Sequence, residues 1–158
     1  MHLLIINCGS SSLKFDVMNV DGDGDIVERP ARGEVDRIGA TPTLHAAAGP
    51  SAIDRAVAAA DHGEAVKLVL EWLADNEYTA GHGIDAVAHR IVHGGARVVE
   101  AAVLDDGVLR AVTDATALAP LHNRPALAAL RGSREVLGHG MPMVALFDTA
   151  FHTTMPDR

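Results

Sequence analysis

Small polar residues followed by a lysine form the first group in this sequence that could do chemistry. They read Asn-Cys-Gly-Ser-Ser-Ser-Leu-Lys at 7–14, directly after an apolar run at 3–6. Gly9 has no side chain and lets backbone amides approach an anion, the serine hydroxyls add donors, and Lys14 supplies a mobile positive charge. These residue types favour a phosphate group as the ligand.

A P-loop and an ordinary hairpin are two other interpretations of the same segment. A P-loop is excluded, because Leu13 stands where that motif has a glycine before its lysine, and a strand pattern follows where the motif needs a helix. An ordinary hairpin with a serine-rich turn fits the segment equally well when it is taken alone.

Further polar residues follow apolar runs at points where strands would end. His93 follows the pattern at 84–92, and Asp148 follows the run at 143–147. In open α/β sheets, ligands bind outside the carboxyl ends of the strands. Asn7 lies at such an end as well, so the arrangement favours a phosphate site over an ordinary hairpin.

A zinc site at His89 and His93 is rejected. Their spacing is that of a helical zinc-binding pair, but Arg90 occupies the position of that motif's glutamate and the segment has a strand pattern. Taken alone, both histidines are expected to satisfy buried partners. Cys8 is expected to be a small packing residue, since nothing adjacent would activate its thiol.

Composition limits the class of protein. The chain has 158 residues, of which 48% are hydrophobic, so it fits one domain with a real core. Its net charge of -8 argues against nucleic acid or an anionic membrane as a partner. It has one cysteine and neither a membrane span nor a signal-peptide pattern, so we expect a cytoplasmic location.

The amino-terminal half predicts three strands joined by tight turns. Apolar and polar residues alternate after the turn, so 12–19 is expected to pair antiparallel with 3–8. An Asp-Gly-rich hairpin turn at 21–25 leads to a third strand at 26–38, interrupted by Pro30 and Gly33. Residues 40–60 are rich in alanine and small polar residues, and we expect a variable excursion there.

The remainder predicts helices alternating with strands. Asp61 and Glu64 form a capping-box pattern for a helix that runs to about Asn76, with Trp72 on its packed face. Segments 84–92 and 142–147 predict strands parallel to the first.

Two more helices are expected between these two strands. The first is capped by Asp105 or Asp106. The second follows a loop at 118–122, is capped by Asn123 with Pro125 in its first turn, and ends at Gly138.

Four motifs resemble those of the acetate kinase family. They are Asn-x-Gly-Ser-Ser-Ser-Leu-Lys at 7–14, His-Arg-Ile-Val-His-Gly-Gly at 89–95, Leu-Ala-Pro-Leu-His-Asn at 118–123 and Phe-Asp-Thr-Ala-Phe-His at 147–152. The resemblance covers the whole chain. It implies an α/β fold of the ribonuclease H-like, actin-like ATPase class, with a mixed sheet of three antiparallel strands plus parallel strands and flanking helices.

The resemblance also implies a reaction and its residues. Phosphate would move between ATP and acetate, giving ADP and acetyl phosphate, with Mg²⁺ as cofactor. Asn7 would help place the metal, and the nucleotide phosphates would lie against Gly9, Ser10, Ser12 and Lys14. Arg90, His122 and Asp148 would be catalytic. Arg90 would bind the transferred phosphoryl group or the substrate carboxylate, and His122 would donate to the phosphoryl oxygens. Val92 and Leu121 would line the acetate pocket.

The chain departs from the family in length and in one loop. Arg124 adds a charge after His122-Asn123, where the family continues with a proline-rich segment. The family is much longer, is homodimeric, and carries its adenosine pocket on a second lobe. We therefore expect residues 1–158 to be one amino-terminal lobe, inactive alone. A non-catalytic phosphate-binding or assembly module, or a kinase for propionate or butyrate, remains as an alternative.

Overall fold

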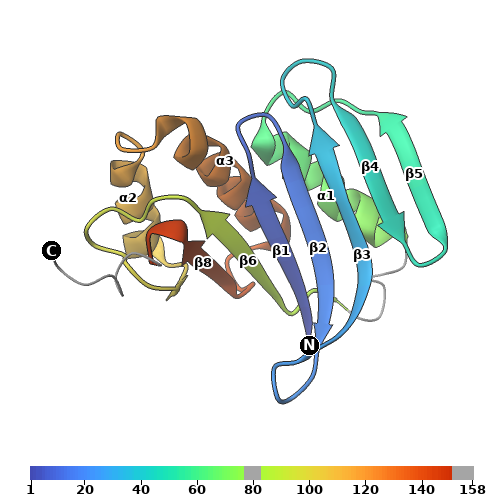
Figure 1. The fold of residues 1–158 in the computed structure, drawn as a ribbon, viewed down its shortest axis with the longest axis horizontal. Helices are drawn as coiled ribbons and strands as arrows, with labels where there is room; N and C mark the ends of the chain where they lie inside the picture. Colours follow the sequence, from blue (N-terminus) through green and yellow to red (C-terminus); the bar gives the residue numbers. More distant parts are fainter. Residues whose placement is uncertain (77–82, 151–158) are drawn as a thin grey trace, which may run out of the picture.

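One mixed sheet organises the chain. The computed structural model describes residues 1–76 and 83–150, and within them eight strands lie in the order β5-β4-β3-β2-β1-β6-β8-β7. Three helices accompany the sheet in the same described ranges (Figure 1). In chain order the elements are β1 (His2–Cys8), β2 (Leu13–Val20), β3 (Ile26–Asp36), β4 (Thr43–Ala48), β5 (Ser51–Ala56), α1 (His62–Asp75), β6 (Ala86–Ile91), β7 (Ala102–Val103), α2 (Asp106–Ala115), α3 (Pro120–Leu137) and β8 (Met143–Phe147).

The predicted strand directions are confirmed. β1 pairs antiparallel with β2, with Cys8 opposite Leu13. β6 is parallel to β1, and β8 is parallel to β6. The α/β class and the mixed sheet are therefore as expected.

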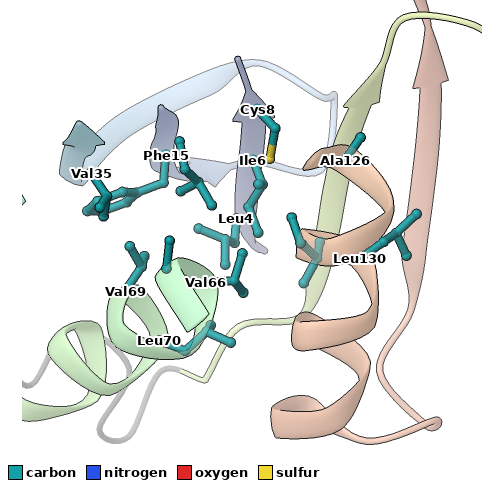
Figure 2. Packing of buried hydrophobic residues seen from close by; sticks show 14 of the residues in the cluster. Leu4, Ile6, Cys8, Phe15, Val35, Val66, Val69, Leu70, Ala126 and Leu130 are labelled. Atoms are coloured by element: carbon teal, nitrogen blue, oxygen red, sulfur yellow. The ribbon is translucent and has the colours of Figure 1, made fainter. Parts of the chain in front are cut away.

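The main core lies between the sheet and helices α1 and α3, which pack on the same face (Figure 2). Alternate residues of β1 point to this face, among them Leu4 and Ile6, which are almost fully buried. They meet Val66 from α1 and Leu130 from α3. The opposite residues of the same strands, including those of the site, face away from the helices.

Helix α1 begins as its capping pattern predicts. The Asp61 carboxylate accepts a hydrogen bond from the Glu64 amide at 2.9 Å, and the Glu64 carboxylate accepts one from the Ala60 amide at 2.7 Å. Trp72 is buried and packs edge-on against Phe15, with ring centroids 5.8 Å apart. The packing role predicted for Trp72 is confirmed.

The prediction of a variable excursion at 40–60 is wrong, because this segment forms β4 and β5. The pattern in β4 alternates between buried and less buried residues, but alanine occupies both faces, so composition hides the period of two. Strand β5 is almost entirely exposed and is held at the sheet edge by pairing with β4. Because β5 has no buried face, its sequence shows no alternation of apolar and polar residues that would predict a strand.

The third strand also continues through the residues expected to interrupt it. Pro30 lies beside a register shift between β2 and β3, where its missing amide is tolerated. A Cβ at Gly33 would come within 2.5 Å of the His45 carbonyl oxygen and 2.7 Å of the Phe15 ring. Glycine is therefore needed at this position for the strands and Phe15 to pack closely.

The amino end of α3 differs from the prediction as well. The helix begins at Pro120 with Ala119 as its N-cap, so 120–122 form its first turn rather than a loop. Proline suits the first helical position because its missing amide would have no partner there. Asn123 lies inside the helix and is not its cap, while α2 is capped by Asp105, as expected. None of the helices in the described ranges is long and apolar enough to cross a membrane.

His89 is a buried titratable group on the helix-facing side of β6. It pairs in register with Ile6 and Ala145, is 2% exposed, and its Nε2 has no hydrogen-bond partner among the described residues. Burial disfavours the charged imidazole and lowers its pKa from 6.5 to about 4.

Replacing His89 by leucine is expected to remove a pH-dependent part of the stability. As pH falls below 6.5, the unfolded chain takes up a proton at this residue before the folded chain does. The stabilisation is thus complete above pH 6.5 and is lost on the way to pH 4. Relative to His89→Leu, the wild-type free energy of unfolding should fall by about 3 kcal/mol over this interval.

Urea unfolding of both proteins across this pH range checks the expectation. His139→Gln, at an exposed position beyond α3, is the matched control and should keep the wild-type dependence. Identical pH profiles for wild type and His89→Leu would contradict the buried, uncharged state of His89.

Candidate functional site

Three parallel strands bring Asn7, Arg90 and Asp148 together. Asn7 and Arg90 are partners in the β1–β6 register, and Asp148 directly follows β8. The Asp148 carboxylate accepts hydrogen bonds from Arg90 Nε at 2.8 Å and Nη2 at 2.6 Å. The Asn7 Oδ1 atom accepts a third from Arg90 Nη1 at 2.9 Å. The guanidinium is therefore fixed from both sides, in a two-pronged geometry that a lysine cannot reproduce.

The same guanidinium keeps capacity for an anion. Arg90 has five N–H donors, of which Asp148 and Asn7 use three. Its side chain is 47% exposed. The hydrogen bonds to Asp148 raise its pKa, so it stays charged. A fixed, accessible cation with free donors is suited to a phosphoryl or carboxylate group.

The predicted phosphate turn connects β1 to β2 and is closed by a 2.8 Å hydrogen bond from the Gly9 amide to the Ser12 carbonyl. A Cβ at Gly9 would come within 2.9 Å of Ser12 Oγ, so glycine makes room for that hydroxyl. Ser10 is exposed on the turn, where its hydroxyl is accessible. The turn thus presents small polar groups at the carboxyl end of β1.

Lys14 lies beside this group on the same face of the sheet. It is the register partner of Asn7 across the β1–β2 pair, and its side chain is 61% exposed. Its ammonium is 3.9 Å from Glu34, an exposed pair that holds it weakly. Lys14 and Arg90 therefore lie on strands either side of β1, roughly 10 Å apart by strand spacing.

A buried histidine supports the phosphate turn, which the sequence pattern did not reveal. His62, the first residue of α1, is 6% exposed, and its Nε2 lies 3.0 Å from the Gly9 carbonyl oxygen. Since that oxygen accepts, Nε2 carries the hydrogen. Burial lowers the pKa of His62 despite this contact. Its place in the Asp61 capping sequence was the only available signal, and that signal concerns the helix alone.

The remaining predicted site residues lie on α3 and on the loop after β6. His122 and Leu121 are exposed in the first turn of α3, with Leu121 72% exposed, and Val92 is half-buried after β6. Among the described residues, no hydrogen bond joins these three to Arg90 or Asp148. Phe151 and His152, the end of the fourth motif, lie outside the described residues.

Asn123 makes contacts that its predicted role as a helix cap does not explain. It is fully buried, donates from Nδ2 to the His93 carbonyl at 2.8 Å, and accepts from the His93 amide at 3.2 Å. A cap would bond to the amides of its own helix. The missed signal was Pro120, which marks a helix start three residues earlier.

Cys8 is confirmed as a packing residue. It is 6% exposed on the core face of β1, and burial raises the pKa of its thiol to about 12. The thiol therefore stays protonated near neutral pH, and the reactive thiolate does not form.

Comparisons with known proteins agree with this geometry. The profile of the acetokinase family matches residues 2–158. The acetate kinase of Thermoanaerobacterium thermosaccharolyticum is 42% identical over 162 residues, which cover 99% of this chain and 39% of that protein. The acetate kinase of Solibacter usitatus is 42% identical over 171 residues, 99% of this chain and 40% of that protein.

Solved structures give the same result. The acetate kinase of Porphyromonas gingivalis matches with a TM-score of 0.85 and 32% identity, over 98% of this chain and 39% of that one. A propionate kinase from Francisella tularensis matches with a TM-score of 0.84 and 29% identity, over 98% of this chain and 38% of that one. The chain thus spans about two-fifths of the length of these relatives, and over that span it belongs to the acetokinase family.

Proposed function

We propose that the chain is the amino-terminal lobe of an acetate kinase, which transfers phosphate reversibly between ATP and acetate to give ADP and acetyl phosphate. The observation that carries this proposal is the Arg90 guanidinium, held by Asp148 and Asn7 on the same face as Lys14 in a member of the acetokinase family. A cytoplasmic location and a homodimer of the two-lobed protein remain predictions.

In this proposal the described residues supply position and positive charge, on which phosphoryl transfer mainly depends. Arg90 binds the transferred group through its two free donors. Lys14 and the turn at 9–12 bind phosphates of the nucleotide. His122, at the amino end of α3, donates to a phosphoryl oxygen, while Val92 and Leu121 line the site of the acetate methyl group.

Asp148 acts in this proposal by orienting Arg90. Both of its carboxylate oxygens already accept hydrogen bonds from that guanidinium. Acetate is ionised at neutral pH and has no proton to give, so a general base has no task in the forward reaction. Asp148 contributes by fixing the Arg90 guanidinium, whose positive charge stabilises the negative charge that develops on the phosphoryl group.

The donor chemistry of the site fits Mg²⁺. Asn7 Oδ1 and the Asp148 carboxylate are oxygen ligands with lone pairs left after bonding to Arg90. In the described part of the chain, no three His, Cys, Asp or Glu side chains cluster as a metal site. Such a sparse set suits a cation held largely by substrate phosphates and water, where Mg²⁺ would neutralise phosphate charge.

The acyl group of the acceptor can be acetate or propionate. The propionate kinase matches the fold nearly as well as the acetate kinase, with TM-scores of 0.84 and 0.85. Leu121 and Val92 form only part of an acyl pocket, so acetate and propionate should both be tested as acceptors.

The chain alone is expected not to turn over, because in-line transfer needs charge on the phosphoryl group from several directions and exclusion of water. A coupled assay for ADP with ATP, Mg²⁺ and either acid compares the chain alone with a protein joining it to a second lobe of the family. Only the two-lobed protein should be active. Acid-dependent turnover by the chain alone would show that one lobe suffices, and an inactive two-lobed protein would favour a non-catalytic module.

Arg90→Lys is expected to reduce kcat strongly in the two-lobed protein, because an ammonium cannot replace a two-pronged contact. Loss of one such transition-state contact typically costs on the order of 3–4 kcal/mol. Steady-state kinetics measures the loss. Arg97→Lys, in an exposed pair with Asp114, is the matched control and should keep normal turnover. Near-normal kcat for Arg90→Lys would assign Arg90 to structure.

A further inference from the structure

The amino end of α3 is fastened to the loop after β6 by one side chain. The buried Asn123 amide pairs with both backbone polar groups of His93, donating at 2.8 Å and accepting at 3.2 Å. We call this pairing of the Asn123 side-chain amide with the His93 backbone the Asn123 clamp. It joins segments thirty residues apart in the sequence. A fully buried amide with satisfied donor and acceptor gives one defined geometry.

Little else fixes the first turn of α3. Among the residues that the structure describes, no side chain caps this helix, whereas Asp61 and Asp105 cap α1 and α2. Pro125 lies inside α3 and has no amide, so the carbonyl of Leu121 lacks the donor that a regular helix provides four residues on. The turn that carries His122 therefore depends on contacts outside the helix.

The loop to which the clamp attaches is itself tightly placed. The Gly95 amide donates to His93 Nδ1 at 2.8 Å, which fixes the orientation of the imidazole. Gly94 is buried, and a Cβ there would come within 2.1 Å of the Val98 carbonyl oxygen and 2.9 Å of the Phe147 ring. Phe147 directly precedes Asp148. The loop thus packs against the strand end that holds the Asp148 carboxylate.

We propose that Asn123 is a positioning residue, which sets the first turn of α3, and with it His122, relative to Arg90 and Asp148. The proposal rests on the proposed phosphotransferase function. Asn123 does not touch the reacting groups in it. It acts through the His93 loop, which follows the Arg90 strand and packs beside the Asp148 strand. Its loss would misplace a donor of the site while the core stays intact.

Two variants and one control test this inference. Asn123→Leu removes both hydrogen bonds at similar size, and Asn123→Asp keeps only an acceptor for the His93 amide. Leu130→Ala is the matched control, because Leu130 is fully buried on the same helix and its loss weakens packing without touching the clamp. If Asn123→Leu does not fold, Asn123→Asp carries the test.

The first measurement is amide hydrogen exchange by NMR on the chain itself. Asn123→Leu should accelerate exchange of the His93 amide roughly tenfold or more relative to amides of β1, whereas Leu130→Ala should not change this ratio. Asn123→Asp should accelerate it as well, because its carboxylate repels the His93 carbonyl oxygen to which the lost amide N–H donated and so opens the pair. An unchanged ratio in both variants would overturn the clamp.

The second measurement is steady-state kinetics on the two-lobed protein. Both variants should lower kcat on the order of 10- to 100-fold with little change in KM for ATP, because a small misplacement of a transition-state donor affects kcat. Leu130→Ala should lose thermal stability and keep its kcat. Accelerated exchange with unchanged kcat would overturn the positioning role. An inactive wild-type protein would instead overturn the proposed function and the catalytic consequence of the clamp, while exchange still decides the clamp.

Discussion

The site depends on the register of three parallel strands. Arg90 reaches Asn7 on one side and Asp148 on the other only because β1, β6 and β8 pair so that all three side chains face away from the helices. A slip of one residue would turn a strand's side chains to the opposite face. The register is held by the alternate residues, such as Ile6, which are buried against α1 and α3. Hydrophobic packing on one face of the sheet therefore determines the hydrogen bonds on the other.

The ion pair between Arg90 and Asp148 contributes to the site more than to the stability of the fold. Its partners are 47% and 37% exposed, and pairs in such surroundings add little to folding free energy. What the pair provides is order, since a long arginine side chain with no partner would sample many rotamers. Two carboxylate oxygens and one amide oxygen limit that freedom before any anion arrives. Preorganised charge of this kind would need little rearrangement in the proposed transfer of a phosphoryl group.

The sequence predicts those parts of the molecule where side-chain pattern and structure share a cause. The predictions of the β1–β2 hairpin and of α1 are confirmed. Alternating apolar and polar residues indicate the strands, and capping residues such as Asp61 and Glu64 indicate the start of the helix. Strands β4 and β5 were missed because alanine does not distinguish a buried face from an exposed one, and because an edge strand is stabilised by pairing. Long-range bonds such as Arg90 to Asn7 leave no local trace. The rule that ligands meet strand ends pointed to Asn7 and Asp148, and Arg90 was predicted only from the resemblance of the 89–95 motif to the acetate kinase family.

Helices α1 and α3 each hold one loop near the site through a hydrogen bond from a buried polar side chain to the backbone of that loop. His62 begins α1 and bonds to the carbonyl of Gly9, and Asn123 near the start of α3 bonds to the backbone of His93. Helix α1 follows β5 and leads into β6, and α3 follows α2 and leads into β8. The contacts of His62 with Gly9 and of Asn123 with His93 place the amino ends of these helices at the loops after β1 and β6. A polar side chain buried there would be costly without a partner. The backbone of a loop supplies that partner, so the loop and the helix fix each other. The loops at the carboxyl ends of β1 and β6, beside the candidate site, are therefore held in place by buried side chains of the core helices.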